Sequence, residues 1–257
     1  MFEAKIADLC RRAEKRYEAA IGDFLTPGEI MQAKSVLGRL HPEGVPVFFG
    51  GYEGSERARL VILPPYVEWT EGDQLLTAYP EVAAEAVCAV KIKGSGYRKL
   101  SHKDYMGSIL SLGLERSVVG DIVPEDEHSA LVFCDPRIGE FLLGELHKIA
   151  NDTVRVEAFT VTAEFRVERQ FLAVHDTVAS PRLDCIVAAL GNLSREKAQT
   201  AIRAEEVEVD YQPEQRVDRV VGAGSIVTVR RIGKFVIRSV DEQTKKGRYR
   251  LVADKYM

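Results

Sequence analysis

The stretch SPRLDCIVAALGNLSREKAQTAIRAEEVEVD, residues 180–210, contains the clearest structural pattern in this chain. Its first half predicts a helix, because apolar residues recur there at helical spacing: Leu183, Ile186, Val187 and Leu190. Ser180 is the expected N-cap, and Pro181 stands in the first turn, where a proline is tolerated. Gly191 with Asn192 ends the predicted helix.

The second half predicts another helix followed by a strand. Ser194 is the expected N-cap of this helix, and its apolar side carries Ala198 and Ile202. Val207 and Val209 then alternate with acidic residues, which is the period-two pattern of a half-buried strand. The stretch therefore predicts two short helices and a strand.

The residue types in this order carry a resemblance. Arg-Leu-Asp opens the first helix at residues 182–184, and Ser-Arg opens the second at 194–195. The pattern closely resembles the RNA-binding domain named after small-subunit ribosomal protein S-four. A later segment, GSIVTVRRIGKF at 224–235, resembles the strand and basic turn that close that domain. One departure is Asp210-Tyr211, where many such domains carry Asn-Gly.

The S-four resemblance implies an RNA-binding face at the two helix starts and in the later hairpin. Arg and Lys neutralise phosphates, and guanidinium groups can pair with them through two hydrogen bonds. Asp184 is expected to orient Arg182 or to cap backbone groups. The implied residues of this face are Arg182, Asp184, Ser194, Arg195, Lys197, Gln199, Arg203, Arg230, Arg231 and Lys234.

The charge of the chain is divided unevenly. The net charge of −4 does not suit a nucleic-acid binder. From Pro181 onward, however, there are 15 Lys and Arg residues against 11 Asp and Glu, whereas the first 180 residues hold 20 against 28. The basic excess therefore lies on the segment with the RNA-binding pattern. Because the excess is modest, we expect a defined RNA site rather than indiscriminate binding of polyanions.

The composition is that of an ordinary soluble globular protein, with 46% hydrophobic and 29% charged residues among 257. No apolar run reaches the roughly 18 residues needed to span a bilayer, and the charged amino terminus does not resemble a signal peptide. The four cysteines are far apart without a CxxC motif, so we interpret them as small core residues in a reducing compartment. We expect a cytoplasmic protein without a membrane partner.

Residues 1–80 predict a small α+β domain. A first helix is expected over 2–21, and Thr26-Pro27-Gly28-Glu29 is a capping box that begins a second. Two strands are expected at 47–49 and 59–63.

Residues 81–165 predict a second domain with the element order βαββαβ. The expected elements are 87–92, 101–113, 118–123, 131–134, 135–149 and 154–159. This order is typical of ferredoxin-like folds, which RNA-recognition motifs share. The order alone says little about function, and the strand aromatics of RNA-recognition motifs are absent. A strand-rich bridge over 160–178 is expected to lead into the S-four domain at 181–257.

The middle domain also carries a basic loop around Gly94-Ser95-Gly96. Glycines, basic side chains and a helix start can together hold a phosphate, although a solvated hairpin loop would have the same composition. The segment GYRKLSHKDYMGSILSLGLERSVVGDI, residues 96–122, is similar to the central segment of the YlmH family, bacterial proteins that end in an S-four domain. The similarity extends over nearly the whole chain. It implies that four more residues face RNA: Arg98, His102, Lys103 and Arg116.

The YlmH resemblance implies a non-catalytic RNA-binding protein. Its domain type is similar to that of heat-shock protein fifteen, which binds large ribosomal subunits still blocked by peptidyl-tRNA. By that analogy the partners are ribosomal RNA, the large ribosomal subunit and tRNA or peptidyl-tRNA, in ribosome-associated quality control. No cofactor, metal ion or catalytic residue is expected.

Two other classes of function stay open. An RNA-modifying enzyme would have its site near His102 and Asp104 in the middle domain. Pseudouridine synthases use an aspartate in an Arg-Leu-Asp context, but here Asp184 opens a helix of the small domain. Methyltransferases need a glycine-rich cofactor loop, and no GxGxxG occurs. The third class, an interaction protein linked to cell division or thylakoids, has no direct support in the residues.

Overall fold

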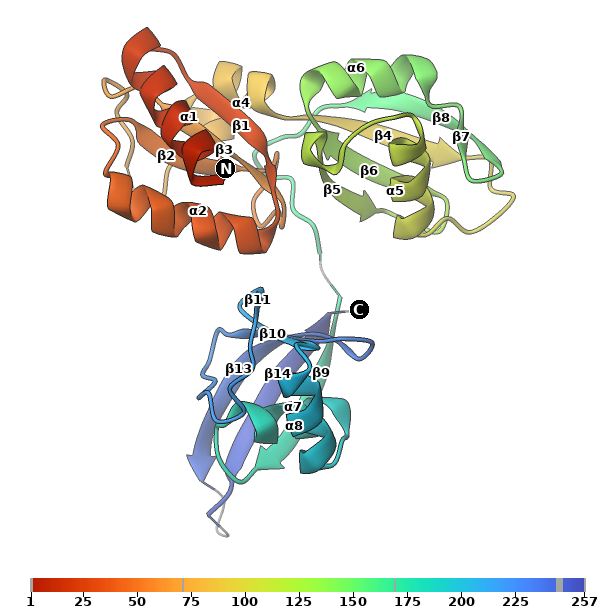
Figure 1. Ribbon diagram of the computed structural model, residues 1–257. Helices are drawn as coiled ribbons and strands as arrows, with labels where there is room; N and C mark the ends of the chain where they lie inside the picture. Colours follow the sequence, from red (N-terminus) through yellow and green to blue (C-terminus); the bar gives the residue numbers. More distant parts are fainter. Residues whose placement is uncertain (1, 71, 169, 244–246, 257) are drawn as a thin grey trace. The chain divides into compact units, whose positions relative to one another are not determined.

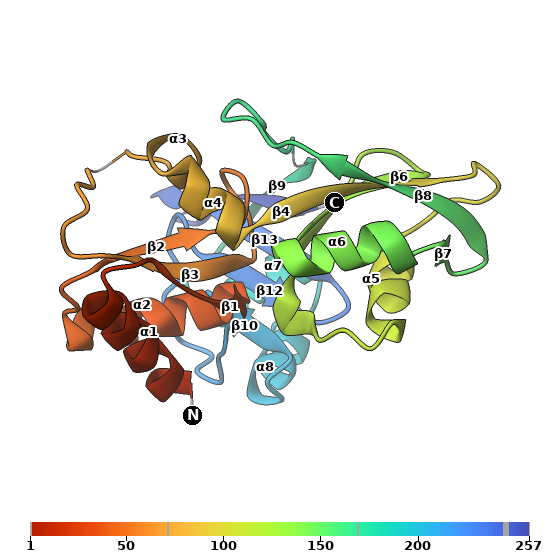
Figure 2. The same ribbon diagram turned by 90° about the horizontal axis from the view of Figure 1, so that it is seen from above.

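The computed structural model describes residues 2–70, 72–168, 170–243 and 247–256, with the side chains of 242 and 243 left aside. The chain forms two compact units, Met1–Val167 and Glu168–Met257. Three antiparallel sheets appear in the described residues, of three, five and six strands (Figures 1 and 2). The predicted α+β class is confirmed. No helix in those ranges is long and apolar enough to cross a membrane.

The first unit begins with a three-stranded sheet in the order β1-β3-β2. Its elements are α1 (Phe2–Arg16), β1 (Ala20–Leu25), α2 (Pro27–Leu40), β2 (Val45–Phe49) and β3 (Ala58–Leu63). Helices α1 and α2 pack together on one face, against Leu60 and Ile62 of β3. The other face of β3 is also covered, so all six of its residues are buried, Arg59 among them.

The predicted helix over 2–21 is too long. Helix α1 ends at Arg16, and Tyr17 takes a left-handed conformation with φ of 56°. Ala20 and Phe24 are then buried in β1, which pairs with β3. The register shifts between Ile21 and Phe24, and this irregularity removes the strict alternation by which a strand is recognised in a sequence. The Thr26 capping box is confirmed, with both of its reciprocal hydrogen bonds present.

The five-stranded sheet of the first unit has the order β5-β6-β4-β8-β7. Its elements are β4 (Cys88–Gly94), α5 (His102–Ser111), β5 (Val119–Pro124), β6 (Ser129–Cys134), α6 (Pro136–Glu145), β7 (Lys148–Ile149) and β8 (Asp152–Phe159). Short helices α3 (Leu75–Ala78) and α4 (Pro80–Ala86) precede it, and a 3-10 turn, Arg116–Val118, precedes β5. The βαββαβ order is confirmed, with the two-residue β7 added.

The two faces of this sheet have different covers. Helices α5 and α6 pack on the face that carries Val90, Ile92 and Val132. The opposite face carries Phe133, which has no exposed surface and whose ring centroid lies 4.7 Å from that of Tyr52. RNA-recognition motifs stack bases on aromatic side chains of this sheet face. Here the equivalent surface around Phe133 is covered by other side chains, so no base can stack on it.

Two buried arginines join the three-stranded and five-stranded sheets. Arg57 donates from Nε to the carbonyl of Val119 at 3.0 Å. Arg59 donates from Nη1 to the carbonyl of Ala86 at 2.8 Å and to Asp135 Oδ2 at 2.7 Å. Buried guanidinium groups are costly unless all their donors are satisfied, so these bonds require both sheets to be in place. The expected boundary near residue 80 therefore separates two sheets of one compact unit.

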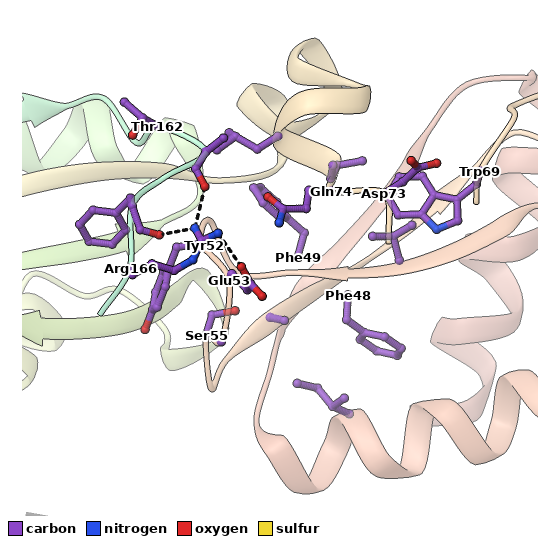
Figure 3. A pocket seen from close by; sticks show the side chains of 18 of the residues that line it. Phe48, Phe49, Tyr52, Glu53, Ser55, Trp69, Asp73, Gln74, Thr162 and Arg166 are labelled. Atoms are coloured by element: carbon purple, nitrogen blue, oxygen red, sulfur yellow. Dashed lines mark hydrogen bonds and ion pairs between the residues drawn. The ribbon is translucent and has the colours of Figure 1, made fainter. Parts of the chain in front are cut away.

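A pocket of about 370 Å³ lies in the first unit, beside β2 and the segment 162–166 (Figure 3). Aromatic side chains of Phe48 and Trp69 line it. Arg166, which also lines it, forms an ion pair of 2.7 Å with Glu53 and donates from Nη1 to a backbone carbonyl at 2.6 Å. These bonds hold the Arg166 guanidinium in place beside the pocket.

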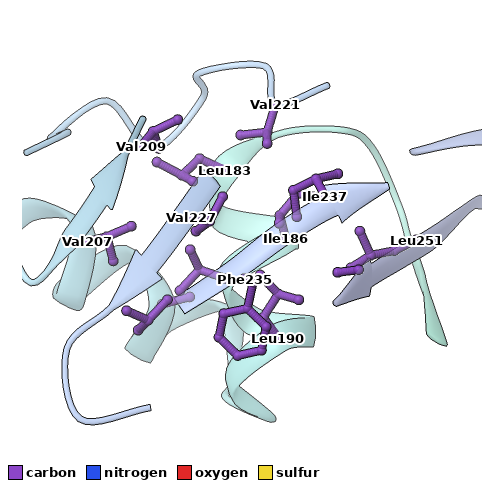
Figure 4. Close-up of a cluster of buried hydrophobic side chains, with 14 of the residues drawn as sticks. Leu183, Ile186, Leu190, Val207, Val209, Val221, Val227, Phe235, Ile237 and Leu251 are labelled. Carbon is purple, nitrogen blue, oxygen red and sulfur yellow. The ribbon is translucent and has the colours of Figure 1, made fainter. Parts of the chain in front are cut away.

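The second unit is a six-stranded sheet with two helices. Its elements are β9 (Phe171–Val178), α7 (Leu183–Gly191), α8 (Arg195–Arg203), β10 (Val207–Val209), β11 (Gln212–Pro213), β12 (Ile226–Val229), β13 (Gly233–Gln243) and β14 (Tyr249–Tyr256). The strand order is β11-β10-β12-β13-β14-β9. Leu183 and Ile186 of α7 pack against Val227, Phe235 and other apolar residues of the sheet (Figure 4). The predicted two helices and strand over 180–210 are confirmed.

Two details at the start of this unit differ from the expectation. Strand β9 pairs with β14 over its whole length, so a domain beginning at residue 181 would lack an edge strand of its own sheet. The N-cap of α7 is Arg182, not Ser180. The first amides of α7 donate to a loop that the sequence analysis did not predict. Leu183 N donates to the carbonyl of Arg219 at 2.8 Å, and Asp184 N donates to the carbonyl of Val217 at 3.0 Å.

The departure at Asp210-Tyr211 leaves the turn geometry intact. Both residues are left-handed, with φ of 53° and 63°, and they connect β10 to β11 as a two-residue hairpin. This is the conformation that Asn-Gly adopts most easily.

We predict that a fragment beginning at Glu168 folds alone, and that a fragment beginning at Ser180 is much less stable. The shorter fragment lacks β9, exposes the edge of β14 and loses the buried Val178. Its melting temperature, followed by circular dichroism, should fall by more than about 10 °C. Equal melting temperatures would show that β9 is dispensable.

Candidate nucleic-acid interface

The carboxylate of Asp184 binds three predicted residues in one cluster. Asp184 lies in the first turn of α7 and its side chain has no exposed surface. It accepts from Arg182 Nε at 3.2 Å, from Arg195 Nε at 3.0 Å and from Gln199 Nε2 at 2.9 Å. We call Asp184, Arg182, Arg195 and Gln199 the Asp184 cluster. The expectation that Asp184 orients Arg182 agrees with these bonds.

The Asp184 carboxylate is ionised over the whole physiological range. Burial raises its pKa, but the hydrogen bonds from Gln199, Arg182 and Arg195 outweigh burial and hold the pKa at about 2. A position in the first turn of a helix also favours a negative charge. The cluster therefore contains one buried anion and two cations that reach the surface.

The two arginines keep hydrogen-bond donors for another partner. Their side chains are 37% exposed for Arg182 and 56% for Arg195, although both are bonded to Asp184. A guanidinium has five N–H donors in a fixed plane, so each retains donors after binding one carboxylate. These donors are held in fixed directions and can bind the oxygens of a phosphate.

The spacing of the polar residues along α8 determines which of them face Asp184. Ser194 is confirmed as the N-cap, because its Oγ accepts from Lys197 N at 3.2 Å. Arg195 and Gln199 are four residues apart and share the side of the helix that faces Asp184; Arg203 continues that row. Lys197 lies on a different side, because each helical residue turns by about 100°. The Ser194 hydroxyl is therefore used by the cap, and Lys197 is separate from the Asp184 cluster.

A second buried carboxylate, Glu214, was not identified from the sequence. Its side chain is 9% exposed and accepts from Arg216 Nε at 3.1 Å and from Arg219 Nη1 at 2.9 Å. The hydrogen bonds from Arg216 lower its pKa most, and despite burial the pKa is about 2. The spacing Glu-x-Arg-x-x-Arg is a weak signal, because nothing in it reveals that the glutamate is buried.

The Glu214 cluster, Glu214 with Arg216 and Arg219, lies beside the start of α7. The carbonyl of Arg219 accepts from Leu183 N, and a β-bridge joins Arg182 to Val220. The loop that carries Arg216 and Arg219 therefore runs along the helix start that carries Arg182. This part of the surface holds more fixed guanidinium groups than the sequence indicated.

The remaining predicted residues of the second unit are dispersed. Arg230 and Arg231 lie at the exposed turn between β12 and β13, and Arg231 has a left-handed φ of 65°. Lys234 is half-buried on the sheet face opposite the core, with its Nζ 4.9 Å from the ring centroid of Tyr211 and 4.4 Å from that of Tyr256. Lys234 thus lies apart from the helical face. Within the described part of the second unit, four predicted cations have no ion pair: Lys197, Arg203, Arg230 and Arg231.

In the first unit, the predicted residues gather around the start of α5. Arg98 is half-buried and its Nη2 lies 3.4 Å from Asp104 Oδ1, whereas Lys103 is exposed. Partial burial and then the charge of Arg116 lower the pKa of His102 below its usual 6.5. This shift favours the neutral imidazole, which can bind RNA through hydrogen bonds.

The Asp104 side chain forms the capping box of α5. Its Oδ2 accepts from Ser101 N at 2.8 Å and from Ser101 Oγ at 2.6 Å. The hydrogen bonds with Ser101 also lower the pKa of Asp104. A carboxylate that is bonded in this way and has a lowered pKa is a weak general base.

Comparisons with known proteins relate this chain to one family. Residues 2–67 match the family description "YlmH, N-terminal", and residues 85–163 match "Putative RNA-binding domain in YlmH". A Bacillus subtilis (strain 168) protein named ribosome-associated protein quality control protein P2 is 25% identical over 246 residues, which cover 95% of this chain and 90% of that protein. The solved structure of cell division protein ylmH from Streptococcus pneumoniae is 19% identical, with a TM-score of 0.49 over 62% of this chain and 89% of that one.

We predict that Asp184→Asn lowers the free energy of unfolding at pH 7 by about 2 kcal/mol. The folded pKa of about 2 is below the ordinary value of 3.8, so the charged carboxylate stabilises the fold above about pH 4. That contribution is lost as the pH falls through 2. Denaturant unfolding should therefore show a difference between wild type and variant at pH 7 that shrinks toward pH 2.

Asp218→Asn is the matched control, because it neutralises an exposed carboxylate in the same unit. It should leave the free energy of unfolding within about 0.5 kcal/mol of wild type. A difference for Asp184→Asn that is independent of pH would mean that packing, not charge, causes its effect.

Proposed function

The chain belongs to the YlmH family, and on this premise we propose that it is a non-catalytic RNA-binding protein of ribosome-associated quality control. We propose further that it binds ribosomal RNA and tRNA on large ribosomal subunits that still carry a nascent chain. The name of its Bacillus subtilis relative and the RNA-binding domain matched by residues 85–163 support the proposal.

The observation that carries this proposal is the Asp184 cluster. A buried carboxylate fixes Arg182 and Arg195 while leaving both guanidinium groups partly exposed. Two fixed guanidinium groups at the starts of two neighbouring helices suit the phosphates of one folded RNA backbone. Such recognition depends on the shape of the RNA, because the deep groove of an A-form helix excludes side chains.

The first unit would supply a second RNA contact. Arg98, Lys103 and Arg116 lie around the start of α5, in the segment matched by the RNA-binding domain of the family. Two separate contact regions allow one protein to bind ribosomal RNA and tRNA together. The protein would then hold the tRNA on the stalled subunit while the nascent chain is extended.

The geometry favours binding over catalysis. Asp184 belongs to an Arg-Leu-Asp tripeptide, but its carboxylate has no exposed surface and is bonded to three side chains. A substrate base could not reach it. The carboxylate of Asp104 is bonded in a helix cap. Crosslinking of the protein to RNA in cells, followed by sequencing, tests the proposal; ribosomal RNA together with tRNA is the expected result.

We predict that Arg182→Ala, Arg195→Ala weakens cosedimentation with purified large ribosomal subunits. Each lost phosphate contact should reduce the magnitude of the slope of log affinity against log salt by about one, and the double variant by about two. The apolar residues of α7 and α8 are untouched, but the buried Asp184 keeps only Gln199 among its three partners, so the melting temperature should fall. Circular dichroism at the assay temperature selects conditions in which the variant is folded.

The control is Arg11→Ala, Arg12→Ala, which removes the same charge from α1. It should bind with the slope of the wild type. If the folded Arg182→Ala, Arg195→Ala variant also binds with that slope, the surface at the starts of α7 and α8 is not an RNA contact. The ribosome assignment then loses its main support.

A further inference from the structure

The ring of Tyr97 has no role in holding the fold together. Its side chain is 86% exposed, in the loop between β4 and α5. In the ranges that the structure covers, its ring contacts no other aromatic ring and its hydroxyl forms no hydrogen bond. Tyr66, the next most exposed aromatic residue, differs because its ring stacks on Tyr17 at 6.5 Å. Single exposed apolar residues are common, so exposure alone implies no function.

The loop around Tyr97 is firmly anchored on its amino-terminal side. Gly94 N donates to the carbonyl of His128 at 2.8 Å, and Ser95 N donates to Asp152 Oδ2 at 3.1 Å. Asp152 is 2% exposed and also contacts the Ser95 hydroxyl. A Cβ atom at residue 94 would lie 2.6 Å from Asp152 Oδ2, so only glycine fits there. The loop backbone is thus bound to the sheet directly before Tyr97.

The carboxyl-terminal side of the loop is anchored as well. His128 Nδ1 donates to the carbonyl of Arg98 at 2.8 Å, and Leu100 N donates to the carbonyl of Glu127 at 2.8 Å. Tyr97 N itself donates to Ser95 Oγ at 3.2 Å, after a turn in which Gly96 has φ of 87°. An exposed ring on a backbone fixed at both ends binds a partner with little loss of loop entropy.

Basic residues follow Tyr97 directly. Arg98 and Lys99 are the next two residues, and Lys103 is exposed in the first turn of α5. Proteins that bind unpaired RNA combine such cations with exposed aromatic rings on which bases stack. The usual stacking surface of this fold is closed here, because Phe133 is fully buried. Tyr97 is therefore the aromatic residue of this domain best placed to meet a base.

We propose that Tyr97 is a base-stacking site, which takes one unpaired nucleobase of the bound RNA while neighbouring cations contact its phosphates. This inference rests on the proposed function, because it requires that the first unit binds RNA. It extends that function from phosphate contacts to the recognition of an unpaired base.

The test measures binding of the full chain to purified large ribosomal subunits across a salt series. Tyr97→Phe should bind like wild type, because stacking needs the ring and not the hydroxyl. Tyr97→Ala and Tyr97→Leu should bind roughly ten-fold more weakly. Their salt slope should equal that of wild type, because stacking releases no counterions, whereas Arg98→Ala should reduce the slope by about one. Melting temperatures should be unchanged in all Tyr97 variants.

Each other outcome is decisive. Wild-type affinity in Tyr97→Ala would remove the stacking site and leave the proposed function intact. Wild-type affinity in Tyr97→Leu, with loss in Tyr97→Ala, would indicate an apolar contact with a protein surface and overturn the assignment of a base. Weak binding of Tyr97→Phe would indicate a hydrogen bond from the hydroxyl and overturn stacking. If the wild-type chain itself fails to bind large subunits, the proposed function fails and this inference fails with it.

Discussion

The proposed RNA-binding surface of the second unit depends on one buried charge, that of Asp184. A carboxylate without exposed surface is stable only when its oxygens are bonded, and here Arg182, Arg195 and Gln199 provide those bonds. The same bonds fix two guanidinium groups that start on different helices. Glu214 repeats the arrangement with Arg216 and Arg219 in the adjacent loop. In both clusters, satisfying a buried anion also orders cations at the surface, which reduces the entropy lost when they bind phosphate.

In the first unit, two sheets pack together into one compact unit. Each sheet has helices on one face, and their other faces share a hydrophobic cluster that includes Phe24, Tyr52 and Phe133. Arg57 and Arg59 complete the joint by donating to backbone carbonyls on both sides of it. This packing closes the sheet face on which RNA-recognition motifs stack bases. The basic loop before α5, with the exposed Tyr97, remains open to a partner.

The sequence predicted those parts of the fold in which one local pattern is sufficient. The helices of the second unit and the capping box at Thr26 were recognised because periodicity and capping are local properties. Strand β1 was missed because its alternation is interrupted between Ile21 and Phe24. Strand β9 was expected only as part of a bridge, since its pairing with β14 joins segments about 80 residues apart. The burial of Glu214 likewise depends on a loop that no local pattern describes, so its cluster was not predicted.

We propose that Asp184 orders arginines that contact RNA, and the affinity of Asp184→Asn for purified large ribosomal subunits tests this most directly. The substitution removes one negative charge, so Coulomb attraction alone would strengthen binding to a polyanion. Loss of order in Arg182 and Arg195 has the opposite sign and should dominate. The measurement is made at pH 7, after circular dichroism has shown that the variant is folded. We expect binding roughly ten-fold weaker than wild type; binding equal to or tighter than wild type would contradict the claim.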